Sequence, residues 1–129
     1  KSAYEMIVEA FAADNLDSVK PYIAPSVFKA FETAVQSRRE AHQTSELQFV
    51  GTEKADVLDS KVTRTEISLT VGFVSNQIRV LRNQTGEVID GDPNRIDRVK
   101  DRWTFARSAN SADPNWQLVA TGGQEPIAG

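Results

Sequence analysis

The fold is decided by the stretch Trp103-Thr104-Phe105-Ala106-Arg107, a loop from Ser108 to Asn115, and Trp116-Gln117-Leu118-Val119-Ala120-Thr121. Side chains alternate between the two faces of an extended strand, so Trp103 and Phe105 share one face of the first segment. By the same rule, Trp116, Leu118 and Ala120 share one face of the second segment. The two segments therefore predict an antiparallel hairpin whose large aromatic side chains close one side of the core.

The loop between these segments contains Asp113-Pro114-Asn115, which has turn chemistry because proline presets φ and Asp and Asn bond to the local backbone. Earlier in the chain the apolar period is two from Leu47 onward, with a turn expected at Asp59-Ser60 and a clear strand around Phe73. Up to Phe73 the apolar residues of this strand occupy odd-numbered positions, and past Asn76 they occupy even-numbered positions. That phase slip predicts a bulge or a sharp bend.

The first forty residues have helical spacing instead. Tyr4, Ile7 and Phe11 mark an amphipathic helix, a short second helix is limited by Pro21, and a third begins at Pro25 or Ser26. Helices followed by a bent sheet predict the α+β class, with N-terminal helices packed on one face of a strongly curved antiparallel sheet.

The composition sets the limits for function. A chain of 129 residues suits one domain, 1–129, with a core of its own. The chain has no cysteine, which excludes thiol chemistry, and its net charge of -3 disfavours nucleic acid as a partner. No apolar run reaches the ~20 residues of a membrane span. Because the chain starts directly before a helix, we expect that an N-terminal membrane anchor or targeting segment is missing.

Two blocks of the sequence resemble one family. They are Ala3-Tyr4-Glu5-Met6-Ile7-Val8-Glu9-Ala10-Phe11 with Leu16 and Pro21, and Arg102-Trp103-Thr104-Phe105-Ala106-Arg107 with Ala112-Asp113-Pro114-Asn115-Trp116-Gln117-Leu118-Val119-Ala120-Thr121. They are similar to the C-terminal domain of the import-motor adaptor of the mitochondrial inner-membrane translocase, and especially to its bacterial putative-adaptor branch. Residues 43–96 match in pattern alone. The resemblance implies a cone-shaped, nuclear-transport-factor-2-like fold with a cavity between sheet and helices.

The resemblance also implies a function. It is that of a non-enzymatic adaptor or scaffold domain in a membrane-associated protein complex, with membrane-complex components or a heat-shock chaperone as protein partners. The expected place is the bacterial inner membrane, with a mitochondrial source as the alternative. Glu5 and Glu9 on the first helix oppose direct membrane binding. No cofactor is expected, and net acidity disfavours a ribosome-associated role.

Two sets of residues are candidate binding sites. The resemblance implies a pocket for a lipid or other apolar ligand. Its expected lining is the core-facing aromatic and aliphatic residues Phe28, Phe31, Val35, Phe49, Ile67, Leu69, Phe73, Trp103 and Phe105. The alternative is that these side chains fill a close-packed core. Alternation places Arg98, Lys100 and Arg102 together on the other sheet face, either as a docking surface for an acidic or polar partner or as a salt-bridged solvent face.

Catalytic and metal-binding patterns are weak in this sequence. His42 is the only histidine, and Asp90-Gly91-Asp92-Pro93-Asn94 lacks the later glycine and glutamate of a calcium loop. We therefore predict no catalytic residue and no metal site. The alternative function is a small-molecule binder or enzyme that uses a buried Asp or Tyr, for which the candidates are Asp56, Asp101, Tyr4 and Tyr22. The nearby residues Arg64, Arg79 and Arg102 favour an ion pair for Asp101.

Overall fold

The computed structural model describes residues 2–110 and 115–126. In this part of the chain, helical segments precede all the strands. The segments are α1 (Ala3–Ala12), the 3-10 helix η1 (Leu16–Tyr22), α2 (Pro25–Glu40), β1 (Thr44–Val62), β2 (Glu66–Arg82), β3 (Val88–Gly91), β4 (Asp97–Ser108) and β5 (Gln117–Pro126). The predicted turn residues Asp113 and Pro114 lie outside the described residues.

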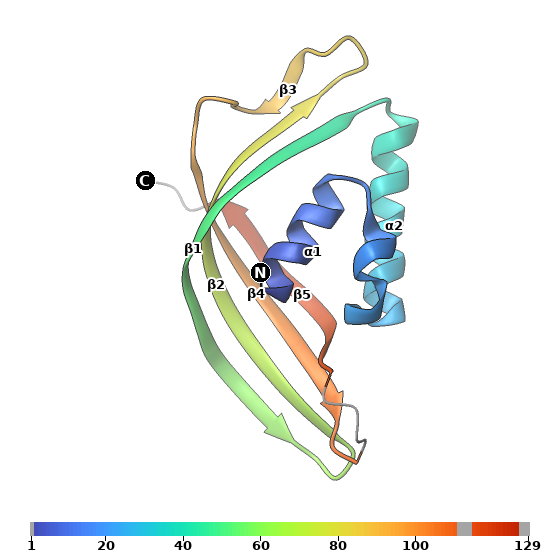
Figure 1. Ribbon diagram of the computed structural model, residues 1–129, viewed down its shortest axis with the longest axis vertical. Coiled ribbons are helices and arrows are strands. Elements are labelled where there is room, and N and C mark those ends of the chain that lie inside the picture. The colour runs from blue at the N-terminus through green and yellow to red at the C-terminus, as the bar shows by residue number, and fades with distance from the viewer. Residues whose placement is uncertain (1, 111–114, 127–129) are drawn as a thin grey trace.

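The five described strands form one antiparallel sheet in the order β1-β2-β4-β5, with β3 paired to β2. β2 pairs with β4 over 66–77 and with β3 over 80–82, so β3 continues the line of β4 along the same edge of β2. The sheet is strongly curved, and α1 and α2 lie against its concave side (Figure 1). This arrangement confirms the predicted α+β class.

The helices are positioned by local chemistry. The Ser2 hydroxyl accepts a hydrogen bond from the Glu5 backbone N–H at 3.2 Å and so caps α1. Pro25 begins α2 at the position where a missing N–H costs nothing. Just before it, the Ala24 N–H donates to the Leu118 carbonyl at 2.8 Å, and Ile23 forms a parallel bridge with the same residue. These two contacts hold the connection between η1 and α2 against β5.

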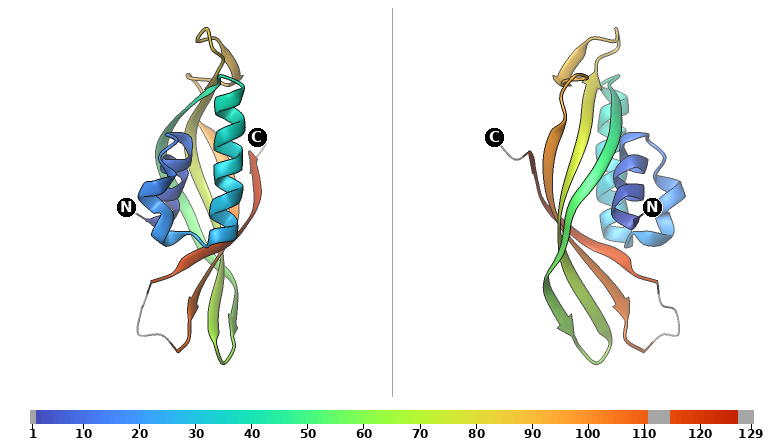
Figure 2. Two further views of the ribbon diagram at one scale, coloured as in Figure 1. Left: turned by 90° about the vertical axis from the view of Figure 1, so that its right-hand side faces the viewer. Right: turned by 60° about the vertical axis from the view of Figure 1, so that its left-hand side comes forward.

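The core lies between α1 and the concave face of the sheet. The Tyr4 ring stacks on Phe73 with 4.0 Å between centroids and meets Trp103 edge-on at 4.8 Å. The helices cover only the half of the sheet that carries β3, and the other ends of β1, β2 and β4 extend past them (Figures 1 and 2). Val57 and Val62 on this uncovered half are 62% and 75% exposed.

The turn predicted at Asp59-Ser60 is wrong, because both residues pair with β2 and the strand continues to Val62. The chain reverses three residues later. There the Thr63 backbone N–H donates to the Glu66 carbonyl at 2.8 Å, and the Thr63 hydroxyl accepts from the Glu66 N–H at 2.9 Å. A threonine side chain that closes the turn replaces the expected Asp-Ser turn.

Of the several register shifts in the sheet, two bear on the predictions from sequence. The phase slip predicted past Asn76 is absent from β2, which keeps Phe73, Ser75 and Gln77 on the core face and pairs with β4 without a shift. The bulge lies in the neighbouring strand β1, where Val50 is the extra residue opposite the Asn76–Gln77 step. In β5, Val119 is a second extra residue. Ala120 therefore pairs with Thr104 on the outer face and is exposed, so its predicted place beside the buried Leu118 is wrong.

Candidate functional site

A cavity of about 200 Å³, here called the inner cavity, lies between α1, α2 and the concave sheet. Its wall is mainly apolar, with Ile7, Val8 and Phe11 from α1 and Phe31 from α2. Strand residues complete the lining with both apolar and polar groups. These are Ser45, Leu47, Gln77, Arg79, Val99, Asp101 and Trp103. A few polar groups in an apolar hollow are typical of small-ligand sites.

The polar groups of the sheet side form a buried network. The Tyr4 hydroxyl donates to Asp101 Oδ2 at 2.5 Å and lies 3.0 Å from the Ser75 hydroxyl. The Gln77 side-chain amide donates to the same Ser75 oxygen at 2.9 Å. Burial, the bond to Asp101 and the charge of that carboxylate raise the pKa of Tyr4, against a smaller lowering by the Ser75 bond. Tyr4 therefore stays protonated and links α1 to β4.

The two arginines of the cavity come from different elements. Arg38 on α2 is half-buried, donates to the Phe11 carbonyl at 2.7 Å and lies over the Phe11 ring. Burial lowers its pKa, because desolvation disfavours the charged form. Arg79 on β2 faces Asp97 at 3.9 Å, which is too long for a hydrogen bond. Within the described part of the chain, Arg38 thus forms no ion pair with a carboxylate, and the ion pair of Arg79 with Asp97 is long.

A second hollow, the β3 groove, has a volume of about 550 Å³ and lies between the end of α2, β2 and β3. Arg38, Ser45 and Arg79 line both the β3 groove and the inner cavity. These three residues therefore mark the boundary between an outer hollow with a mixed lining and a mainly apolar inner one.

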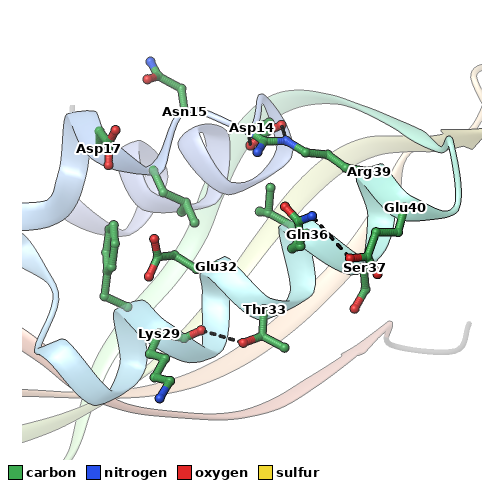
Figure 3. Close-up of a pocket in the computed structure, with 13 residues that line it drawn as sticks. Asp14, Asn15, Asp17, Lys29, Glu32, Thr33, Gln36, Ser37, Arg39 and Glu40 are labelled. Atoms are coloured by element: carbon green, nitrogen blue, oxygen red, sulfur yellow. Dashed lines mark hydrogen bonds and ion pairs between the residues drawn. The ribbon is translucent and has the colours of Figure 1, made fainter.

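A third hollow, the helix groove of about 630 Å³, lies between η1 and the outer side of α2 (Figure 3). Asp14 and Arg39 form a two-point ion pair at one end, with bonds of 2.6 and 2.8 Å. The Glu32 side chain points into the groove, and Lys29 points away from it (Figure 3). Its rim is polar and open to solvent.

The structure distributes the predicted pocket residues among different places. Phe31 and Trp103 line the inner cavity, whereas Phe28 and Val35 line the helix groove. Phe73 belongs to the packed core, and Phe49 and Phe105 pack against it. Ile67 and Leu69 lie half-buried beyond the helices, because β2 extends farther than α1 does.

The basic residues of β4 lie on the outer face of the sheet. Arg98, Lys100 and Arg102 are exposed, and they alternate with the buried Val99, Asp101 and Trp103 as predicted. Arg98 forms an ion pair with Glu53 of β1 at 2.6 Å. We call these three residues the basic face.

The remaining candidates are spread over the surface. Asp56 and His42 are exposed, and Tyr22 is 38% exposed. Among the side chains of residues 2–110 and 115–122, no group of three or more His, Cys, Asp or Glu is placed to hold a metal ion. In the same part of the chain no helix has the length and hydropathy needed to cross a membrane.

Asp101 meets a partner that the sequence did not suggest. Of the three arginines expected near Asp101, Arg102 lies on the opposite face, Arg64 lies in the β1–β2 turn and Arg79 lines the same cavity. The Tyr4 hydroxyl donates a hydrogen bond to the Asp101 carboxylate. Ser75 and Gln77 were also missed as parts of the network. Their positions, two and four residues after Phe73, were a usable signal, because alternation puts all three on the core face.

Comparison with known proteins gives consistent matches. The model of the Tim44-like domain family matches residues 1–123. A probable mitochondrial import inner membrane translocase subunit, tin-44, of Caenorhabditis elegans is 25% identical over 126 residues, covering 95% of this chain and 30% of that protein. The mouse and human TIM44 subunits of the same translocase are 24% and 22% identical over 115 residues, covering 88% of this chain and 25% of each relative. The chain thus spans between a quarter and a third of the length of these relatives.

Proposed function

The chain belongs to the Tim44-like domain family, and from that membership we propose that it is a non-enzymatic adaptor domain of a membrane-associated protein-transport complex. The observation that carries the proposal is the family match over 1–123, which includes the helices, the inner cavity and the basic face. The matched relatives are named as subunits of an inner-membrane translocase. We propose the bacterial inner membrane as its place of action.

The basic face is the proposed docking surface for protein partners. Among the side chains of residues 2–110 and 115–122, no carboxylate forms an ion pair with Lys100 or Arg102. We propose that these two charges meet an acidic segment of the partner. The partners proposed are components of the membrane complex or a heat-shock chaperone. A docking surface on the outer sheet face leaves the helices and the inner cavity free for a second role.

That second role is an apolar ligand pocket in the inner cavity. Phe31 and Trp103 lie in its wall with Ile7 and Leu47. An apolar hollow with a few polar groups supports binding of an apolar or amphiphilic molecule.

Site-directed photo-cross-linking tests the docking role. With a photoreactive residue in place of Lys100, in native membranes, we expect adducts with a transport-complex component or a heat-shock chaperone. Reversing charge at Arg98 and Arg102 should reduce those adducts, because rim charges control encounter. The same charge changes at Lys61 and Arg64, at the far hairpin end, serve as the matched control. Equal loss from both pairs, or adducts that persist in both, would count against the docking surface.

The alternative function is a small-molecule binder or enzyme, and one observation favours it: Asp101 is 1% exposed, lines the inner cavity and is bonded to Tyr4. The cross-linking experiment separates the two functions. Asp101→Asn, in a variant shown to be folded, should leave the Lys100 adducts unchanged if the domain is an adaptor. Loss of adducts with an intact fold would give Asp101 a role beyond structure.

A further inference from the structure

The inner cavity and its boundary with the β3 groove each contain a buried hydrogen-bond donor of interest. The Nε atom of Arg79 and the Nε1 atom of Trp103 are buried and lack a hydrogen-bond partner within the described part of the chain. Buried donors are nearly always paired in folded proteins, so each unpaired one calls for an explanation. A bound molecule whose oxygen atoms accept hydrogen bonds from these donors would explain why they are unpaired within the protein.

The charges at the boundary favour an anion. Arg38 forms no ion pair with a carboxylate among the described residues, and its one hydrogen bond of 2.7 Å goes to a neutral carbonyl. The nearby Asp14 carboxylate is taken by both nitrogens of Arg39. Half-buried guanidinium groups are most stable beside a carboxylate or phosphate, whose planar or tetrahedral oxygens match their fork of donors.

The ion pair of Arg79 with Asp97 is long. The Asp97 carboxylate lies 3.9 Å from the Arg79 Nε atom and is bonded by Arg95 at 2.7 Å. Asp101 lines only the inner cavity, so its charge disfavours an anion deep inside and leaves the boundary as the place for one. Ser45 lies at the same boundary and adds a hydroxyl donor.

The size of the inner cavity limits the rest of the ligand. About 200 Å³ is slightly more than the ~150 Å³ of an engineered apolar cavity that binds benzene. It is less than the ~300–1,000 Å³ of pockets for drug-sized ligands. The apolar wall of Val8, Phe31 and Leu47 therefore suits a single ring or a short chain.

We propose that Arg38 and Arg79 bind the carboxylate of a small organic acid, whose compact apolar body occupies the inner cavity. The proposal rests on the ligand-pocket part of the proposed function and names the ligand class. The carboxylate lies at the boundary beside Ser45, and the apolar body lies under α1 against Trp103.

Nuclear magnetic resonance of the ¹⁵N-labelled protein tests this with benzoate as the probe. The chain has two tryptophans, so a Trp116→Phe variant assigns the indole N–H signal of Trp103. We expect benzoate to shift that signal saturably. Benzamide, which has the same shape without charge, should bind at least about tenfold more weakly, and inorganic phosphate should leave the Trp103 signal in place.

Variants identify the residues that hold the anion. Arg38→Gln and Arg79→Gln should each weaken benzoate binding by about tenfold or more, whereas Arg102→Gln, on the outer face, should leave it unchanged. If one cavity variant does not fold, the other carries the same expectation. Equal binding of benzamide, equal loss in Arg102→Gln, or no shift of the Trp103 signal up to the solubility limit of benzoate would overturn the proposal.

Two further outcomes are decisive. Hexadecanoate binding that excludes benzoate would mean that a long acyl chain is the ligand and would overturn the compact-acid class. Failure of every probe would leave the docking role intact, because the cross-linking test concerns the opposite face of the sheet.

Discussion

At the scale of single residues, the protonation state of Tyr4 is the clearest consequence of burial. Its hydroxyl is enclosed and donates to Asp101, which raises the pKa above the ordinary value of about 10. The folded protein therefore holds a proton that the unfolded chain releases above that pH. The stability from this site is complete below pH ~10 and decreases as pH rises further.

A Tyr22→Phe variant makes Tyr4 the only tyrosine, so its ionisation can be followed by tyrosinate absorbance. We expect no ionisation step near pH 10 while the tryptophan fluorescence of the folded state persists. The absorbance should instead increase together with unfolding. An ionisation step near pH 10 in the folded protein would contradict the buried hydrogen bond.

Residue-scale prediction from sequence succeeded where alternation along one strand was enough. It placed Asp101 with Val99 and Trp103 and placed Lys100 on the opposite face. It did not find the partner of Asp101, because Tyr4 is on a helix at the other end of the chain. Contacts of that kind depend on how a helix lies on the sheet, which local patterns do not encode.

At the scale of elements, two glycines with similar backbones have very different surroundings. Gly91 ends β3 at φ 78°, and a Cβ atom there would lie 2.0 Å from the Arg79 carbonyl oxygen. Gly86 has φ 88° in the β2–β3 turn, with open space around it.

Alanine at these two positions separates backbone strain from steric clash. Gly86→Ala should cost about 1–2 kcal/mol of unfolding free energy, the penalty of a left-handed residue. Gly91→Ala should cost about 1–3 kcal/mol more, because β3 must move off β2. Denaturant unfolding measures both. Equal costs would mean that β3 is not held closely at Arg79.

The ends of helices and strands show how far apolar periodicity and turn-forming residues predict structure from sequence. The helix starting at Pro25 was predicted because proline there marks a first turn. The end of β1 was predicted wrongly, because Asp59-Ser60 has the composition of a turn but pairs with β2. The Val50 and Val119 bulges depend on pairing between strands, and so single-strand patterns cannot place them.

At the scale of the whole molecule, the helices protect only half of the sheet. Residues 67–70 of β2 are paired with both β1 and β4, as residues 73–77 are, but only 73–77 lie under the helices. Hydrogen exchange should therefore be at least about tenfold faster in 67–70, because one buried large side chain contributes about 1.5–3 kcal/mol. Uniform protection along β2 would mean that another surface covers the uncovered half.

The bond between Ala24 and Leu118 has a consequence for synthesis of the protein. It joins positions 118 − 24 = 94 residues apart. At the usual ~5–20 residues per second of translation, the helices wait roughly 5–20 s before their last strand is made. The β1–β2 hairpin can form within that interval, but α2 gains its anchor only when β5 leaves the ribosome. Folding of this domain can therefore finish only after β5 has been synthesised.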